Sequence, residues 1–121
     1  MTMFSFKKFI HSLQYAFRGL KYAFKEEQSF RVQVVIALVV IALMFYLDVT
    51  PLEKIAFLIM IVLVLSLELI NTTAENILNV VEPNFRPKVQ IIKDTMAAAV
   101  VVAALGALIV GLIIFLPYLL K

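Results

Sequence analysis

The sequence contains no cysteine, a single histidine and only three glycines. The lack of cysteine excludes disulfide bonds, thiolate nucleophiles and cysteine-ligated metal sites. Gly19, Gly106 and Gly111 are too scattered to form a glycine-rich phosphate-binding loop, and no Walker A pattern is present. An enzyme of this sequence that used a nucleotide would have to hold it through lysine and carboxylate-bound metal.

Charged residues are also scarce, at 16% of 121 residues, whereas 64% are hydrophobic and the mean hydropathy is +1.04. This composition predicts an all-α integral membrane protein, organised as a single domain over residues 1–121. The basic residues lie beside apolar segments rather than in one dense stripe, so nucleic acid is not an expected partner.

Residues 4–27 have the pattern of an amphipathic helix that lies in the membrane interface. Apolar residues recur at spacings of four and three, while lysine and arginine occupy the flanks and the opposite face. The alternative is an ordinary surface helix of a bundle. The apolar positions are Phe6, Ile10, Leu13, Phe17, Leu20 and Phe24.

Three apolar segments follow, and we expect transmembrane helices at 32–49, 52–81 and 94–117, the second with a cytoplasmic extension. Pro117 is expected to end the third helix. Six Lys and Arg residues lie in 1–31 and three in 79–94. The positive-inside rule then predicts a cytoplasmic N-terminus and an external C-terminus.

The end of the second span carries an unusual set of polar residues on one helical face. At about 100° per residue they form one stripe, and ionisable groups at this depth are costly and usually functional. Carboxylates and amides without cysteine or histidine suit Mg²⁺, which often shares phosphate ligands. The alternative is that the stripe only joins helices. Its members are Glu68, Asn71, Thr72, Glu75 and Asn79.

Other charged residues are expected on the same side of the membrane. Glu26 and Glu27 lie where the interfacial helix meets the first span, and one of them could complete a metal site. The alternative, which suits Glu26 better, is the solvated end of a helix. Lys93 and Arg86 are candidate phosphate partners. Arg31 is a weaker candidate for lipid phosphate or an acidic neighbour.

Three motifs resemble the bacterial diacylglycerol kinase/undecaprenol kinase family. They are "EQSFR" at 27–31, "ELINTTAE" at 68–75 and "KDTMAAAV" at 93–100. The closing "GLIIFLP" at 111–117 looks more like the Gram-positive undecaprenol kinase branch. The likeness covers nearly the whole chain.

The resemblance implies a homotrimeric helical bundle in the bacterial inner membrane, with its active site in the cytoplasm. It also implies transfer of phosphate from ATP, with Mg²⁺, to a lipid alcohol. Undecaprenol is the favoured acceptor, yielding undecaprenyl phosphate; diacylglycerol, yielding phosphatidic acid, is the close alternative. A non-catalytic membrane scaffold is the alternative from another class.

The same resemblance assigns roles to individual residues. The family usually has Asp where this chain has Asn79, which predicts a weaker metal affinity or rate. By position, Glu68 would be the general base, Glu27 and Glu75 would bind metal, and Asn71, Asn79, Lys93 and Asp94 would form the nucleotide site.

Overall fold

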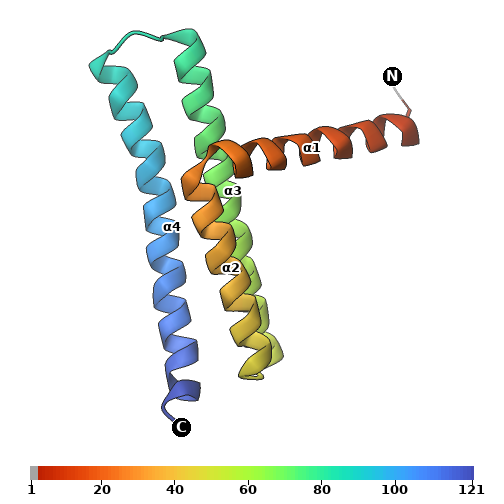
Figure 1. Cartoon of the computed structure of the whole chain (residues 1–121), viewed down its shortest axis with the longest axis vertical. Coiled ribbons are helices and arrows are strands. Elements are labelled where there is room, and N and C mark those ends of the chain that lie inside the picture. Colours follow the sequence, from red (N-terminus) through yellow and green to blue (C-terminus); the bar gives the residue numbers. More distant parts are fainter. Residues whose placement is uncertain (1–2) are drawn as a thin grey trace.

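The computed structural model describes residues 3–121 as four helices and no strand. Figure 1 shows α2, α3 and α4 running side by side, with α1 projecting sideways across them. The last three helices are each long and apolar enough to cross a membrane. The predicted all-α membrane fold is confirmed. The helices are α1 (Phe6–Glu26), α2 (Gln28–Tyr46), α3 (Pro51–Val81) and α4 (Pro87–Leu119).

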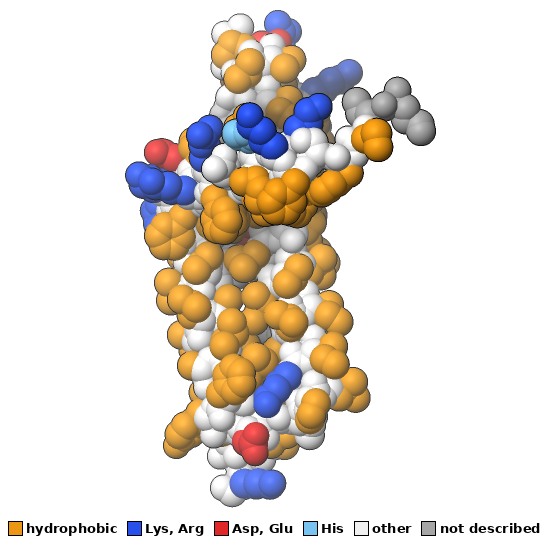
Figure 2. Space-filling view, turned by 90° about the vertical axis from the view of Figure 1, so that its right-hand side faces the viewer, with side chains coloured by type: hydrophobic (Ala, Val, Ile, Leu, Met, Phe, Trp, Pro, Cys, Tyr) orange, Lys and Arg blue, Asp and Glu red, His pale blue; other side chains and the backbone are white. Residues whose placement is uncertain are grey.

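Helix α1 is the amphipathic segment expected at 4–27, and it begins where the Ser5 side chain accepts a hydrogen bond from the Lys8 N–H at 3.4 Å. Figure 2 shows basic side chains along the upper edge of this helix and apolar side chains along its lower edge, toward the apolar part of the bundle. This arrangement is typical of a helix at a membrane surface, with aromatic groups toward lipid and charges toward water.

A sharp bend at Glu27 separates α1 from α2, and Arg31 stabilises it. The Arg31 guanidinium donates to the carbonyls of Phe24 at 2.9 Å and Lys25 at 2.7 Å. These carbonyls belong to the last turn of α1, where no intrahelical donor is available. A cation at a helix C-terminus also interacts favourably with the helix dipole. Arg31 therefore ends α1 and directs the chain into α2.

The turn between α2 and α3 is closed by local polar contacts. Asp48 has a φ of 51°, a left-handed conformation that aspartate adopts more readily than most residues. Thr50 and Glu53 form a capping box at the start of α3, with Pro51 in the first turn. The Glu53 carboxylate also accepts a hydrogen bond from the Tyr118 hydroxyl of α4 at 2.5 Å.

Helix α3 is the central element, because α2 and α4 both pack against it while their own backbones stay apart. Next to the α2–α3 turn, a small apolar core forms, in which the rings of Phe57 and Phe115 stack with centroids 4.4 Å apart. Most other apolar side chains face outward, as expected where lipid replaces water as the solvent. The buried members of this core are Met44, Val49, Phe57 and Phe115.

Both ends of α2 and both ends of α4 differ from those expected. Helix α2 covers Gln28–Tyr46 rather than 32–49, because the left-handed Asp48 ends it early. Helix α4 begins at Pro87 rather than 94 and continues through Pro117 to Leu119. Proline suits the first turn of a helix. Pro117 removes only one hydrogen bond near the helix end, and the Leu120 N–H already bonds the Leu116 carbonyl at 2.9 Å.

The last two helices are longer than a membrane requires. Helix α3 has 31 residues and α4 has 33, which correspond to about 46 and 50 Å, against a hydrocarbon thickness of about 30 Å. Figure 1 shows the α3–α4 hairpin rising beyond the level of α1. The last turns of α3 and the first turns of α4 therefore stand on the α1 side of the bilayer.

Candidate functional site

The polar stripe of α3 becomes less buried toward the α3–α4 loop. The Glu68 side chain is 4% exposed and Thr72 is 6% exposed. Asn71 and Glu75 are half-buried, and Asn79 is exposed. The stripe therefore leads from the apolar part of the bundle to its solvated end, with a carboxylate at each of two depths.

The bend after α1 brings a third carboxylate to the stripe. Glu27 is half-buried at the junction of α1 and α2. The charges of Glu27 and Glu75 both act on the Glu68 carboxyl. Glu27 and Glu75, from two parts of the sequence, thus both lie within electrostatic reach of Glu68. The repulsion that they exert on the Glu68 carboxylate is a cost that a bound cation would reduce.

These side chains do not form a complete metal cage. Within residues 3–121, no group of three His, Asp or Glu side chains is arranged to hold a metal ion by itself. Mg²⁺ usually keeps several waters and is held by one or two carboxylates together with substrate phosphates. One or two carboxylates are therefore a donor set compatible with Mg²⁺ that also binds phosphate.

Asn71 provides the strongest evidence that a ligand fits here. Its Nδ2 donates to Glu75 Oε1 at 3.3 Å, while its Oδ1 is buried and accepts from no donor among residues 3–121. A buried acceptor without a partner costs about 1–3 kcal/mol. This oxygen is therefore free to bind a cation or to accept from a donor on a ligand. An amide oxygen beside a carboxylate is a donor set that Mg²⁺ accepts.

The first turns of α4 add a lysine and an aspartate to the site. Lys93 Nζ donates to Asn79 Oδ1 on α3 at 2.8 Å, and Gln90 Nε2 donates to Asp94 Oδ1 at 2.8 Å. The amide at position 79 therefore orients the lysine without neutralising it, so the ammonium keeps its charge for an anion. The longer N-terminal part of α4 places Lys93 two turns into the helix rather than at its start.

The two arginines have other partners. Arg31 is occupied by the carbonyls that end α1. Arg86 lies in the loop between α3 and α4 and pairs with Glu82 at 3.3 Å. Both remain candidate anion contacts, but the structure brings neither of them to the stripe.

Two polar contacts near the site were missed at the sequence level. Gln90 precedes Asp94 by one helical turn, so its spacing alone could have identified that pair. Asn76 Nδ2 donates to the Tyr22 hydroxyl at 3.3 Å and joins α3 to α1. No sequence signal connects two residues 54 positions apart.

A comparison with known protein families supports the motifs. The family model described as prokaryotic diacylglycerol kinase matches residues 14–115. The chain belongs to this family. The matched region includes the bend at Glu27, the whole stripe of α3 and the lysine and aspartate of α4, so family membership covers every part of the candidate site.

Individual relatives within the family have different names. The chain is 34% identical over 111 residues to a diacylglycerol kinase of Synechocystis, covering 91% of this chain and 63% of that protein. It is 32% identical over 112 residues to the undecaprenol kinase of Bacillus subtilis, covering 93% and 88%. A diacylglycerol kinase of Haemophilus influenzae is 39% identical over 70 residues, covering 58% and 59%. These relatives are kinases of two different lipid alcohols.

Proposed function

We propose that the protein phosphorylates a membrane lipid alcohol with MgATP, and that undecaprenol is the acceptor. The observation that carries this proposal is the buried Glu68 carboxylate, which is flanked by Glu27, Glu75 and the unpartnered Asn71 oxygen at the α1 level of the bundle. Family membership provides the reaction class. The site provides a base near lipid and anion- and cation-binding groups nearer to water.

Glu68 is the residue proposed to act on the lipid. Its carboxylate takes the proton of the lipid hydroxyl as the lipid oxygen forms a bond to the γ-phosphorus of ATP. The bond between that phosphorus and the β–γ bridging oxygen breaks, and ADP leaves. Because Glu68 lies one helical turn above residues of the apolar bundle, it can reach a hydroxyl that never leaves the bilayer.

Glu27, Glu75 and Asn71 are the residues proposed to hold Mg²⁺ with the ATP phosphates. When bound, Mg²⁺ neutralises charge that builds up on the phosphates during transfer. Lys93 supplies a further positive charge for the phosphates, and Asp94, fixed by Gln90, orders the nucleotide side of the site. The contribution of these residues is positioning and electrostatic stabilisation.

The topology proposed from the charge distribution agrees with this division of roles. The N-terminus, the α3–α4 loop and the site would lie in the bacterial cytoplasm, where ATP is available, and the C-terminus outside. We also propose a homotrimer in the inner membrane. The resemblance of the three motifs to the family supports this assembly.

The reaction is tested by carboxylate variants in a phosphate-transfer assay. Purified protein in detergent micelles receives labelled ATP, Mg²⁺ and either undecaprenol or diacylglycerol. We expect label in undecaprenyl phosphate, and its loss in Glu68→Gln and Glu75→Gln. Glu82→Gln is the matched control, because that carboxylate pairs with Arg86 in the loop.

The outcomes test the lipid acceptor and the phosphate-transfer reaction separately. Transfer to diacylglycerol alone would retain the kinase assignment and overturn the acceptor. Absence of transfer to both lipids, or full activity in both stripe variants, would overturn the reaction itself.

A further inference from the structure

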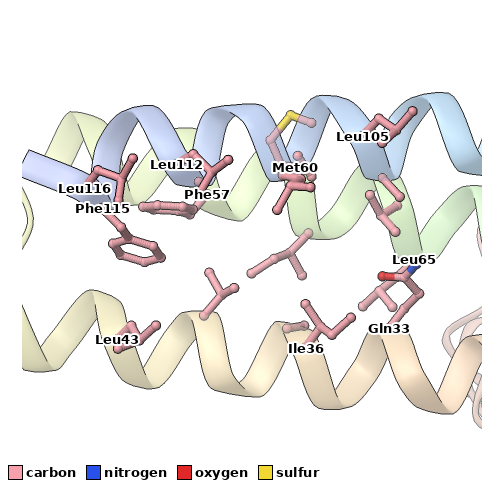
Figure 3. A pocket seen from close by; sticks show the side chains of 18 of the residues that line it. Gln33, Ile36, Leu43, Phe57, Met60, Leu65, Leu105, Leu112, Phe115 and Leu116 are labelled. Carbon is pink, nitrogen blue, oxygen red and sulfur yellow. The ribbon is translucent and has the colours of Figure 1, made fainter. Parts of the chain in front are cut away.

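An apolar groove of about 540 Å³ lies between α2 and α4, with α3 as its floor. It exists because the backbones of α2 and α4 stay apart while each packs against α3. Figure 3 shows lining side chains from all three helices pointing into this space, with Gln33 and Leu65 at one end and Leu43, Phe115 and Leu116 toward the other.

The groove is polar at one end only. Gln33 is the one lining residue with a polar side chain, and its amide is drawn beside Leu65. On α3, Val64 and Leu65 line the groove, and Glu68 follows one turn later on the same face. The rest of the lining consists of aliphatic, methionine, phenylalanine and glycine residues. The groove thus has the polarity of an amphiphile, with its polar end directly below Glu68.

The length of the groove indicates which kind of lipid tail it fits. On α2 the lining runs from Gln33 to Leu43, on α3 from Phe57 to Leu65 and on α4 from Val101 to Leu119, which are about 15, 12 and 27 Å at 1.5 Å per residue. One leaflet contributes only about half of the 30 Å hydrocarbon layer. The part walled by all three helices is therefore about one leaflet deep, and the α4 wall alone continues past the middle of the bilayer, where only a longer chain can follow it.

Small residues keep the middle of the groove open. Ala104 and Gly111 both line it from α4. A Cβ built on Gly111 would lie 3.9 Å from the ring of Phe57, so the backbone tolerates a side chain there, and a longer one would project into the groove. These positions can be used to close the groove at two depths, about 10 Å apart along α4.

We infer that this groove binds the hydrocarbon tail of the lipid substrate, with the hydroxyl at Glu68, and that its depth selects a long polyprenyl chain over the acyl chains of a glycerolipid. This inference rests on the proposed kinase function. It assigns acceptor choice to α2 and α4 below the site rather than to the polar stripe.

The test is chain-length dependence in groove variants. Wild-type protein, Gly111→Leu and Ala104→Leu are assayed with farnesol, geranylgeraniol and undecaprenol, which contain three, four and eleven isoprene units. Gly111→Leu should raise KM for undecaprenol about tenfold or more and leave both short alcohols unchanged, since about 1.4 kcal/mol of lost contact corresponds to tenfold. Ala104→Leu closes the groove nearer to Glu68, so it should also impair geranylgeraniol.

Ala98→Leu is the matched control, because it adds the same side chain to an exposed position of α4 outside the groove. It should leave all three KM values unchanged. Retained farnesol turnover in the groove variants shows that they are folded.

Several outcomes would overturn the inference. Equal losses for all three alcohols, or no change in chain-length preference, would show that the groove does not hold the tail. A change in oligomer mass in Gly111→Leu, measured by light scattering in detergent, would mean that a second copy fills the groove. Wild-type protein that transfers phosphate to no alcohol would instead overturn the proposed function.

Discussion

The two ends of α3 contain similar side chains in opposite states. Next to the α2–α3 turn, Glu53 accepts hydrogen bonds from the Thr50 N–H at 2.9 Å and from Tyr118, and closes a capping box. At the other end, Glu68 is buried beside two further acidic groups, and Asn71 Oδ1 has no partner among the described residues. The polar groups at the first end find their hydrogen-bond partners within the chain, whereas Asn71 Oδ1 at the other end does not.

This difference separates structural from functional polar groups. A satisfied cap stabilises a helix and needs nothing from outside. Clustered carboxylates and an unpaired buried acceptor destabilise the chain without its ligand. Proteins retain such destabilising groups where ligand binding offsets their cost. Even Glu27, at the N-cap position of α2, makes no capping hydrogen bond to its own helix.

The largest expected effect comes from removing the charge of the buried carboxylate. Glu68→Gln should lower kcat about a hundred- to ten-thousand-fold, the usual contribution of a general base. It should not destabilise the fold, because it also removes repulsion with Glu27 and Glu75. Turnover and thermal unfolding in detergent, measured on the same preparation, check both statements. A variant that unfolds would place Glu68 with the structural groups.

Arg31 lies near the candidate site, but its hydrogen bonds are made within the chain. Its replacement tests whether such a residue contributes to the stability of the fold. Arg31→Ala removes two charge-assisted hydrogen bonds to the last turn of α1, and we expect a loss of about 1.5–3 kcal/mol for this contact. Hydrogen exchange of the α1 amides should rise most near Phe24 and Lys25. Unchanged exchange there would mean that the bend is held by other contacts.

A change at the other end of α3, next to the α2–α3 turn, should alter the stability of the protein and leave its activity unchanged. Tyr118→Phe removes the hydroxyl that bonds Glu53 and leaves the ring in place. The unfolding midpoint should fall, while kcat and the KM for MgATP stay the same. A loss of kcat in a fully folded variant would show that the two ends are coupled and would weaken the contrast between them.

The smallest expected effect is that of a change at Asn71, and it tests the difference between the two ends of α3 most directly. Asn71→Leu removes the unpaired buried acceptor but also the 3.3 Å hydrogen bond from Nδ2 to Glu75, so the free protein should gain no more than about 1 kcal/mol of stability. The same change should raise the Mg²⁺ concentration needed for half-maximal activity. Asn79→Leu at the exposed end of the stripe is the control, and it should give no gain in stability.

Local sequence patterns accounted for much of this molecule. The hydropathy and the amphipathic pattern of 4–27 predicted the four helices, and the spacing of three and four residues placed Glu68, Asn71 and Glu75 on one face. The Asn71–Glu75 contact agrees with that spacing. The boundaries at Asp48 and Pro87 were missed because a left-handed turn residue and a first-turn proline act on the backbone, not on hydropathy. The roles of the site residues stay predictions.

The sequence by itself determined the class of the protein, because periodicity and apolar length follow from the geometry of one helix and the thickness of one bilayer. Only the tertiary structure brought Glu27 to Glu68, Lys93 to Asn79 and Tyr22 to Asn76. Those pairs depend on the bend at Arg31 and on how α2 and α4 pack against α3. The same packing forms the groove, because residues of α2, α3 and α4 line it together.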